Sequence, residues 1–237
     1  MAARNYGQYC GVVTALELVG ERWALLIVRD LLVGPRRYSD LKNGLPRIPT
    51  NILSTRLKEL QEAGVIHRIP LARCGLVYDL TEFGRGLEDV VLALGRWGFH
   101  AMGDPAPDDI ITNDSMTMAF RTAFQADVAA AYPPTAYQVH IGDVALGLRT
   151  VAGTLQIAPV PGSSGVPLPA TVNPFSHGID LTFAAGPGIR SLIAGELSPA
   201  AAIANGTVHV LGGDAALLDR FAATFSLRLG AQHAPAA

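Results

Sequence analysis

The chain has 237 residues, of which 49% are hydrophobic and 16% charged, so it can bury a large core and is not disordered. No apolar run approaches the ~20 residues that span a bilayer, and the N-terminus lacks the apolar segment of a signal peptide. Two cysteines and six scattered histidines form no metal or disulfide motif. We therefore expect a soluble, cytoplasmic protein without a membrane span, metal or cofactor.

The formal net charge of −2 hides a difference between two parts of the chain. Residues 1–104 contain 13 basic and 11 acidic side chains, whereas residues 105–237 contain 5 and 9. The change falls at the helix-breaking stretch 103–107 (GDPAP). We expect a first domain over 1–104 and a second over 105–237, and only the first has the charge to attract DNA.

In chain order, three helices are predicted before residue 44. Residues 12–19 give the first, and the almost wholly apolar segment 23–32 gives a second that belongs to the domain core. A short amphipathic helix over 39–43 follows, and the prolines at 46 and 49 close the turn after it. That turn leads into the most informative part of the sequence.

The stretch 49–66 predicts a helix of about four turns. Its leucines at 53, 57 and 60 recur at helical spacing and form one apolar stripe. Thr50 is suited to cap the start of the helix, and Gly64 is suited to the left-handed position after its end. The opposite face is short, polar and able to hydrogen-bond.

Basic residues gather around this helix. Residues 36–73 hold eight Lys or Arg against three Asp or Glu, and two β-prone runs at the end of this segment predict a hairpin with Arg73 near its tip. Two helices joined by a tight turn and followed by a basic hairpin are typical of a DNA-binding winged helix-turn-helix. The predicted DNA-binding residues are Arg36, Arg37, Thr50, Asn51, Ser54, Thr55, Lys58 and Arg73.

A long helix is predicted over 81–102. Its apolar face is wider than a small domain needs internally, and aromatic residues concentrate the energy of interfaces. We therefore expect this face to form a protein interface, with Trp97 as an anchor. The interface residues are Leu87, Val91, Leu94 and Trp97.

Residues 9–98 resemble the HxlR family of winged-helix transcription regulators, a branch of the MarR-like group. The resemblance rests on Tyr9-Cys10, Gly20-x-Arg22-Trp23, Arg29-Asp30-Leu31, the run 37–41 (RYSDL), Leu45-Pro46-x-Ile48, Leu53-Ser54-x-Arg56-Leu57, Gly64-Val65-Ile66, the run 77–81 (VYDLT), Gly84 and Trp97-Gly98. The chain departs from the family at the wing tip, which reads ARCG instead of containing proline. The resemblance implies a homodimer on double-stranded DNA, in which the first and last helices pair across a two-fold axis.

Cys10 stands just before the first helix and allows two interpretations. Most free cysteines are small buried hydrophobes. Some members of the resembled family, however, sense oxidants or electrophiles with a cysteine at the matching position, and a helix N-terminus favours the reactive thiolate. Cys10 is therefore a candidate regulatory thiol.

The second domain alternates glycine-bounded strands with helices. A helix is expected over 114–131, followed by strands over 136–160 and 178–185, a helix over 188–195, a strand over 207–213 and a final helix over 214–225. This order predicts an α+β sandwich with a mainly antiparallel sheet.

Residues 189–229 resemble the sterol-carrier-protein type-two-like domain, which implies an apolar tunnel for hydrophobic molecules between sheet and helices. The residues that carry the resemblance are Leu192, Gly195, Leu197, Ala202, Asn205-Gly206, Val208, Val210, Gly213-Asp214 and Phe221. The predicted pocket residues are Leu192, Val208, Val210 and Phe221. The alternative is that these side chains simply fill a core.

Two functions fit these features. The first is a dimeric DNA-binding regulator controlled by a hydrophobic small molecule, and the second is a lipid carrier or hydrophobic-substrate protein that uses the winged helix for assembly. A module used only for assembly would not need the basic face, so we favour the regulator. No nucleophile–base pair, phosphate-binding glycine loop or carboxylate pair is found, so we do not expect an enzyme.

Overall fold

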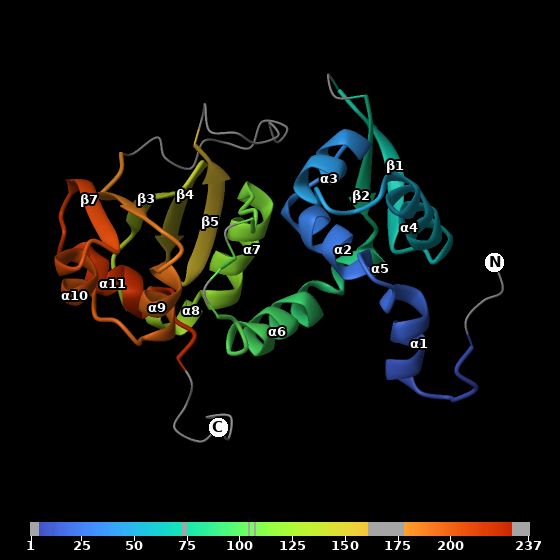
Figure 1. Cartoon of the computed structure of the whole chain (residues 1–237), viewed down its shortest axis with the longest axis horizontal. Coiled ribbons are helices and arrows are strands. Elements are labelled where there is room, and N and C mark those ends of the chain that lie inside the picture. The colour runs from blue at the N-terminus through green and yellow to red at the C-terminus, as the bar shows by residue number, and fades with distance from the viewer. Residues whose placement is uncertain (1–4, 73–74, 104, 107, 161–177, 229–237) are drawn as a thin grey trace. The chain divides into compact units, whose positions relative to one another are not determined.

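A computed structural model describes residues 5–72, 75–103, 105–106, 108–160 and 178–228. The chain divides into residues 1–91, here the winged-helix unit, and residues 92–237, here the C-terminal unit. Their elements are labelled in Figure 1. This division falls within helix α6, whereas the sequence places the domain boundary at 104 and 105, which stays a prediction.

The winged-helix unit contains helices and one hairpin, as predicted. Its elements are α1 (Gly11–Val19), α2 (Ala24–Val33), α3 (Tyr38–Gly44), α4 (Thr50–Glu62), β1 (Ile66–Leu71), β2 (Gly75–Leu80) and α5 (Glu82–Arg85). Strands β1 and β2 pair antiparallel. The core takes one apolar face from each of α2, α3 and α4, where Ile27, Leu41 and Leu53 are fully buried.

The end of α4 follows its sequence signal, but its start does not. Gly64 adopts φ +69°, and the amide of Val65 donates to the carbonyl of Leu60 over 2.9 Å, which is the Schellman termination that the sequence predicts. Thr50, in contrast, is the first helical residue rather than the cap. The cap position belongs to Pro49, which has no side-chain group to bond the helix amides.

The helix predicted over 81–102 is interrupted. The chain forms α5 and then α6 (Glu88–Phe99), with a turn at Gly86 between them. The first part is fixed by contact with the rest of the unit, since a Cβ on Gly84 would lie 2.0 Å from the carbonyl oxygen of Val65. The helical pattern of the sequence does not reveal this close approach.

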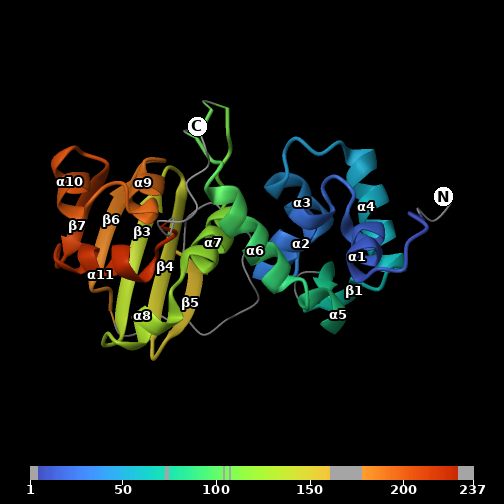
Figure 2. The same cartoon turned by 90° about the horizontal axis from the view of Figure 1, so that it is seen from below.

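The C-terminal unit is built on a five-stranded sheet of order β5-β4-β3-β6-β7, and Figure 2 shows the strands side by side in this order. Only the β3–β6 pair is parallel among these pairings, so the sheet is mainly antiparallel, as predicted. The strands are β3 (Thr135–Ile141), β4 (Val144–Val151), β5 (Thr154–Pro159), β6 (Leu181–Ala185) and β7 (Val208–Gly213).

Five further helices accompany this sheet. They are α7 (Asn113–Ala123), α8 (Ala126–Ala130), α9 (Ile189–Ala194), α10 (Pro199–Ala204) and α11 (Leu217–Thr224). The helix predicted over 114–131 is thus two helices, because Phe124 leaves helical geometry and forms a β-bridge with Phe225. Among the described residues, no helix combines the length and hydropathy needed to cross a bilayer.

Candidate nucleic-acid interface

Helix α4 buries one face and exposes the other. Leu53, Leu57 and Leu60 are at most 1% exposed and hold the helix against the unit. Asn51 and Ser54 are exposed on the remaining surface, as are Thr50 and Lys58, and Thr55 is half-buried. The leucine stripe thus positions a polar face outward, as the sequence predicts.

Two of the hydroxyl groups on this face already donate within the helix. Ser54 Oγ donates to the carbonyl of Thr50 over 3.1 Å, and Thr55 Oγ1 donates to that of Asn51 over 2.9 Å. Their lone pairs remain free to accept, which suits the amino groups of bases. Asn51 and Lys58 add donors, which suit the acceptor atoms on base edges.

Tyr38 ties α3 to the start of α4. Its hydroxyl donates to the carbonyl of Thr50 over 3.0 Å and lies 3.3 Å from Ser54 Oγ. Tyr38 is the first residue of α3, so this contact fixes the angle between the two helices at the end where the outward face begins. The helix-turn-helix is therefore held by a polar contact as well as by its core.

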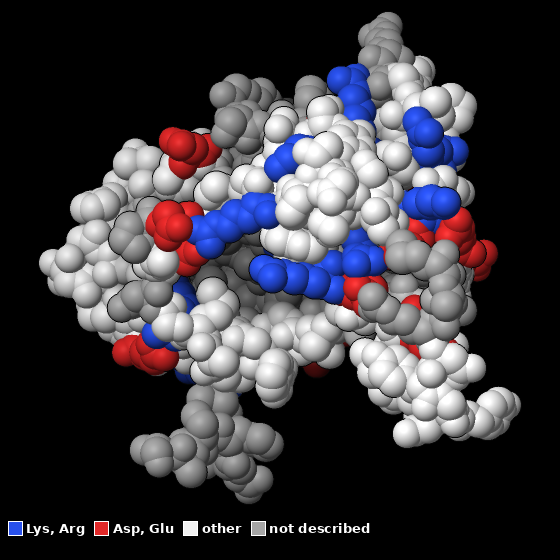
Figure 3. All heavy atoms as spheres, turned by 45° about the vertical axis from the view of Figure 1, so that its right-hand side comes forward, with Lys and Arg blue, Asp and Glu red and all other residues white. Residues whose placement is uncertain are grey.

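Basic side chains flank this face. Arg37 is exposed at the start of α3, where its backbone amide donates to Asp40 Oδ2 over 2.8 Å. The Lys58 side chain is 77% exposed, and its Nζ is 3.7 Å from Glu62 Oε1, a surface pair that contributes little to stability. Figure 3 shows Lys and Arg side chains on the surface of the winged-helix unit that faces the viewer.

Arg36, which the sequence analysis predicts to bind DNA, is buried instead. It is 2% exposed, its backbone pairs with Tyr78 of β2 through bonds of 2.9 and 2.8 Å, and its guanidinium donates to the carbonyl of Pro35. In this position it holds the hairpin to the helices and cannot reach a phosphate. Arg73, the predicted wing contact, lies outside the described residues.

The region that matches known proteins covers most of this unit and continues through α6. The sequence model of the HxlR-like helix-turn-helix family matches residues 18–105. YdeP of Bacillus subtilis, an HTH-type transcriptional regulator, is 36% identical over 91 residues, which are 38% of this chain and 71% of YdeP. This chain belongs to the HxlR-like helix-turn-helix family. The match does not extend over the sheet of the C-terminal unit.

Other HxlR-like similarities cover the same part. The HTH-type transcriptional regulator Mb3122 of Mycobacterium bovis is 45% identical over 86 residues, which are 35% of this chain and 54% of that protein. The HTH-type transcriptional regulator ytcD, known from a crystal structure, is 36% identical in sequence. The match covers 38% of this chain and 94% of the ytcD chain, with a TM-score of 0.36. The chain therefore spans about half the length of the mycobacterial relative.

One residue of this HxlR-like unit, Arg56, was given no structural role by the sequence analysis. It lies on α4 beside the leucine stripe, and its side chain is 12% exposed. Its Nη2 donates to Glu21 Oε2 over 2.6 Å, Nη1 contacts Glu59 Oε2, and Nε donates to the carbonyl of Arg22 over 3.3 Å. Arg56 thus fastens the candidate recognition helix to the turn between α1 and α2.

That turn has an unusual backbone. Trp23 adopts φ +80°, a left-handed conformation that side-chain-bearing residues seldom take, and the Arg22 guanidinium lies 5.2 Å from the centre of its ring. A Cβ on Gly20 would lie 2.4 Å from the carbonyl oxygen of Leu16. The turn is therefore tightly specified, which makes it a firm anchor for Arg56.

Cys10 is exposed at the N-terminal cap of α1, which excludes the interpretation as a buried hydrophobe. The backbone amides of Val13 and then Val12 lower the pKa of the Cys10 thiol. They belong to the open first turn of α1, where amides without helical partners favour negative charge. The thiol is thus accessible and biased toward its nucleophilic form.

Helix α6 exposes the apolar face that the sequence predicts to form an interface. None of its residues is buried, and Trp97 and Leu94 are 77% and 46% exposed. Leu87 and Val91 are half-buried. Helix α1 also exposes apolar residues, since Val12 is 68% and Leu16 is 49% exposed.

The predicted ligand-pocket residues occupy the core instead. Leu192, Val208 and Phe221 are at most 1% exposed, and Val210 packs partly buried against them. The ring of Phe221 lies 4.8 to 6.1 Å from those of its aromatic neighbours, measured between centroids; these are Phe120, Tyr137, Phe183 and Phe225. Large rings fill the space that the sequence assigns to a ligand.

Metal binding has no visible site in the described part of the chain. No three His, Cys, Asp or Glu side chains among those residues gather in a way that could hold an ion. The candidate functional residues are therefore the outward face of α4, the basic residues around it, the thiol at α1 and the apolar surfaces of α1 and α6.

Proposed function

We propose that this chain is a sequence-specific, DNA-binding transcription regulator that acts as a homodimer. The observation that carries the proposal is the polar outward face of α4, held by a buried leucine stripe within a winged helix-turn-helix. Helices presented in this way enter the major groove, where short polar side chains reach base edges. Membership of the HxlR-like family supports the same function.

Within this proposal the residues divide into two groups. Asn51, Ser54, Thr55 and Lys58 face the bases, with Thr50 at the entry of the helix into the groove. Arg37 and Arg73 contact phosphates on either side of it. Base contacts specify the sequence and phosphate contacts position the protein, so the two groups have different experimental signatures.

A pair of variants tests this division. Asn51→Ala removes an amide that can form hydrogen bonds with an adenine. We therefore expect the binding free energy to weaken by about 1–3 kcal/mol and the base preference to relax at one base pair of the operator. Arg37→Ala removes one phosphate contact and should lower the salt slope of binding by about one unit at unchanged preference. Fluorescence anisotropy on a set of single-base operator variants, over a salt series, measures both.

The matched control is Lys42→Ala, which also removes a positive charge from the helix-turn-helix. Lys42 Nζ donates to the carbonyl of Pro46 over 3.0 Å, so this charge belongs to the turn and not to the outward face. Unchanged specificity in Asn51→Ala together with an unchanged slope in Arg37→Ala would contradict the assignment of α4 to the groove.

The homodimer is proposed from the exposed apolar surfaces of α1 and α6. An exposed Trp97 with Leu94 beside it is costly to leave in water and is typical of a contact surface. A two-fold pairing of these helices would place two α4 helices on successive major grooves, as a near-palindromic operator requires.

For the C-terminal unit we propose an effector-binding role on an α+β sandwich of the sterol-carrier type. The mainly antiparallel sheet and the resemblance over 189–229 support it, and the weakly charged composition of residues 105–237 agrees. The effector acts by binding one arrangement of the dimer more tightly than another. A lipid carrier that used the winged helix for assembly would bind ligand without binding DNA, which the assays above distinguish.

Cys10 supports a second input, namely sensing of electrophiles or oxidants, because the thiol is exposed and its pKa is lowered. The lowered pKa leaves more thiolate near neutral pH. We expect alkylation by iodoacetamide to reach half its maximal rate at a lower pH than in the unfolded chain. A Cys74→Ser variant isolates the Cys10 signal, mass spectrometry follows the label, and the same protein in urea is the control. Coincident pH profiles would refute the sensor.

A further inference from the structure

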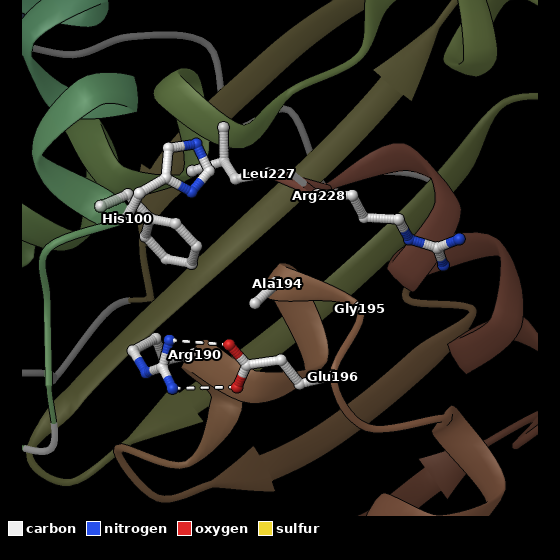
Figure 4. A pocket seen from close by; sticks show the side chains of 8 residues that line it. His100, Arg190, Ala194, Gly195, Glu196, Leu227 and Arg228 are labelled. Carbon is white, nitrogen blue, oxygen red and sulfur yellow. Dashed lines mark hydrogen bonds and ion pairs between the residues drawn. The ribbon is translucent and has the colours of Figure 1, made fainter. Parts of the chain in front are cut away.

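A pocket of about 300 Å³ opens on the surface of the C-terminal unit, at the edge of the packed core. It lies between the end of α6, the C-terminal end of α9 and the chain that follows α11. Figure 4 shows the side chains around it. The lining residues are Phe99, His100, Arg190, Ala194, Gly195, Glu196, Leu227 and Arg228.

The apolar part of this lining is continuous with the core. Phe99 packs against the core cluster, Leu227 is 8% exposed, and Ala194 lies beside them. The His100 ring meets the Phe99 ring edge-on, with 5.9 Å between their centroids. A ligand in the pocket would therefore bury an apolar surface against these side chains, and a volume of about 300 Å³ is at the small end of ligand sites.

The backbone of the pocket is fixed by local bonds. The amide of Leu227 donates to the carbonyl of Ile193 over 2.9 Å, and the amide of Glu196 donates to that of Ser191 over 2.9 Å. The chain after α11 is thus attached to α9, and the last turn of α9 has its own partners. The pocket does not depend on a ligand for its shape.

Gly195 allows the Arg228 side chain to cross this turn. Gly195 has φ +74°, and a Cβ there would lie 2.6 to 2.9 Å from Nε, Cγ and Cδ of Arg228. Any other residue would strain the backbone and displace the arginine. The sequence therefore gives a left-handed turn that keeps a cationic side chain at the pocket.

The fixed charges around the pocket favour an anion. Arg190 holds both carboxylate oxygens of Glu196, with Nη–Oε distances of 3.3 and 2.9 Å, so these two residues neutralise each other. Arg228 is exposed and has no ion-pair partner among the residues that the structure describes. One positive charge thus remains at the edge of the pocket, where it would repel a cation, although Figure 4 shows the Arg228 guanidinium pointing away from Leu227.

We propose that this pocket binds a small amphipathic carboxylate. The apolar body of the ligand lies on Phe99 and Leu227, and its carboxylate pairs with Arg228, which turns toward it. The site uses none of the core residues Leu192, Val208 or Phe221. Its regulatory use rests on the proposed function: Phe99 is the last residue of α6, so an occupied pocket holds the end of the helix that carries the proposed dimer surface.

The direct test is calorimetric titration of the full chain with phenylacetate. The neutral 2-phenylethanol and the cationic 2-phenylethylamine are matched probes. We expect phenylacetate to bind with at least tenfold higher affinity than either. Arg228→Gln and Gly195→Ala should each weaken it at least tenfold, whereas Lys58→Gln, which removes an equal charge from the winged-helix unit, should leave it unchanged. Circular dichroism of each variant establishes that it is folded.

Three results would each overturn the proposed site. They are equal affinity for the three probes, a phenylacetate affinity in folded Arg228→Gln equal to that of the parent protein, and no heat of binding at millimolar phenylacetate. Operator binding measured with and without phenylacetate tests the regulatory part separately. An unchanged operator affinity with the pocket filled would overturn regulation through α6, while the carboxylate site and the DNA-binding function would both stand.

Discussion

An Arg56→Met variant is expected to lose at least tenfold in operator affinity while keeping the salt slope of the parent protein. The side chain lies on the inner flank of α4 and contacts Glu21, Glu59 and the backbone of Arg22. Its removal leaves two carboxylates without their shared cation, so α4 loses its attachment to the turn before α2. A tenfold loss corresponds to ~1.4 kcal/mol.

The same variant should be less stable than the parent. Removing one partner from hydrogen-bonded charged groups costs about 1–3 kcal/mol when they are partly buried. Thermal unfolding measures this loss, and a further Glu21→Gln substitution should restore part of it, because it removes one of the two carboxylate charges that Arg56 contacts. Full stability in Arg56→Met would show that the contacts do not fasten the helix.

Lys58→Met is the control, because it removes a cation from the outward face of the same helix. It should keep its stability within about 0.5 kcal/mol, as exposed positions do, and relax sequence preference at the base pair that Lys58 faces. If Arg56→Met lowered the salt slope instead, Arg56 would be a phosphate contact and not a positioning residue.

Replacing Trp97 by serine is expected to weaken the homodimer by about 30-fold or more, since anchoring aromatic residues contribute at least ~2 kcal/mol to interfaces. Its 77% exposure means that little packing within the chain is lost. Sedimentation equilibrium of the full chain measures the dimer constant. On DNA, the variant should bind half-sites as a monomer at concentrations where the parent binds the full operator.

The control for this variant is Leu211→Ser, which removes an apolar side chain that is 60% exposed on β7, an element that is not part of the proposed interface. It should leave dimerisation unchanged. Equal dimer constants for Trp97→Ser and the parent protein would remove α6 from the interface, and a larger effect of Leu211→Ser would place the interface at the sheet edge.

Local sequence signals predicted most of the winged-helix unit. The apolar periodicity located α1 to α4, the leucine stripe oriented α4, and Gly64 located its end. These features depend on residues within one or two helical turns of each other. Glycine-bounded segments predicted the strands and most helices of the C-terminal unit in the same way, but α10 was not predicted.

The errors share a different cause, namely contacts between distant residues. The burial of Arg36 comes from its pairing with Tyr78, and the break at Phe124 comes from its bridge to Phe225. The role of Arg56 requires Glu21, which is 35 residues earlier in the chain, before α2 and α3. The pattern of apolar residues around Phe221 is the same for a tunnel lining and for a filled core, so the sequence left both alternatives open.

The central claim is that two α4 helices of a homodimer read DNA in successive major grooves. Selection of binding sites from random double-stranded DNA by the full chain tests it most directly. We expect an enriched, near-palindromic sequence with half-sites about 10–10.5 base pairs apart, centre to centre. The enrichment should be lost at one position of each half-site with Asn51→Ala. Recovery of no sequence, or of a single motif without its inverted copy, would contradict the account.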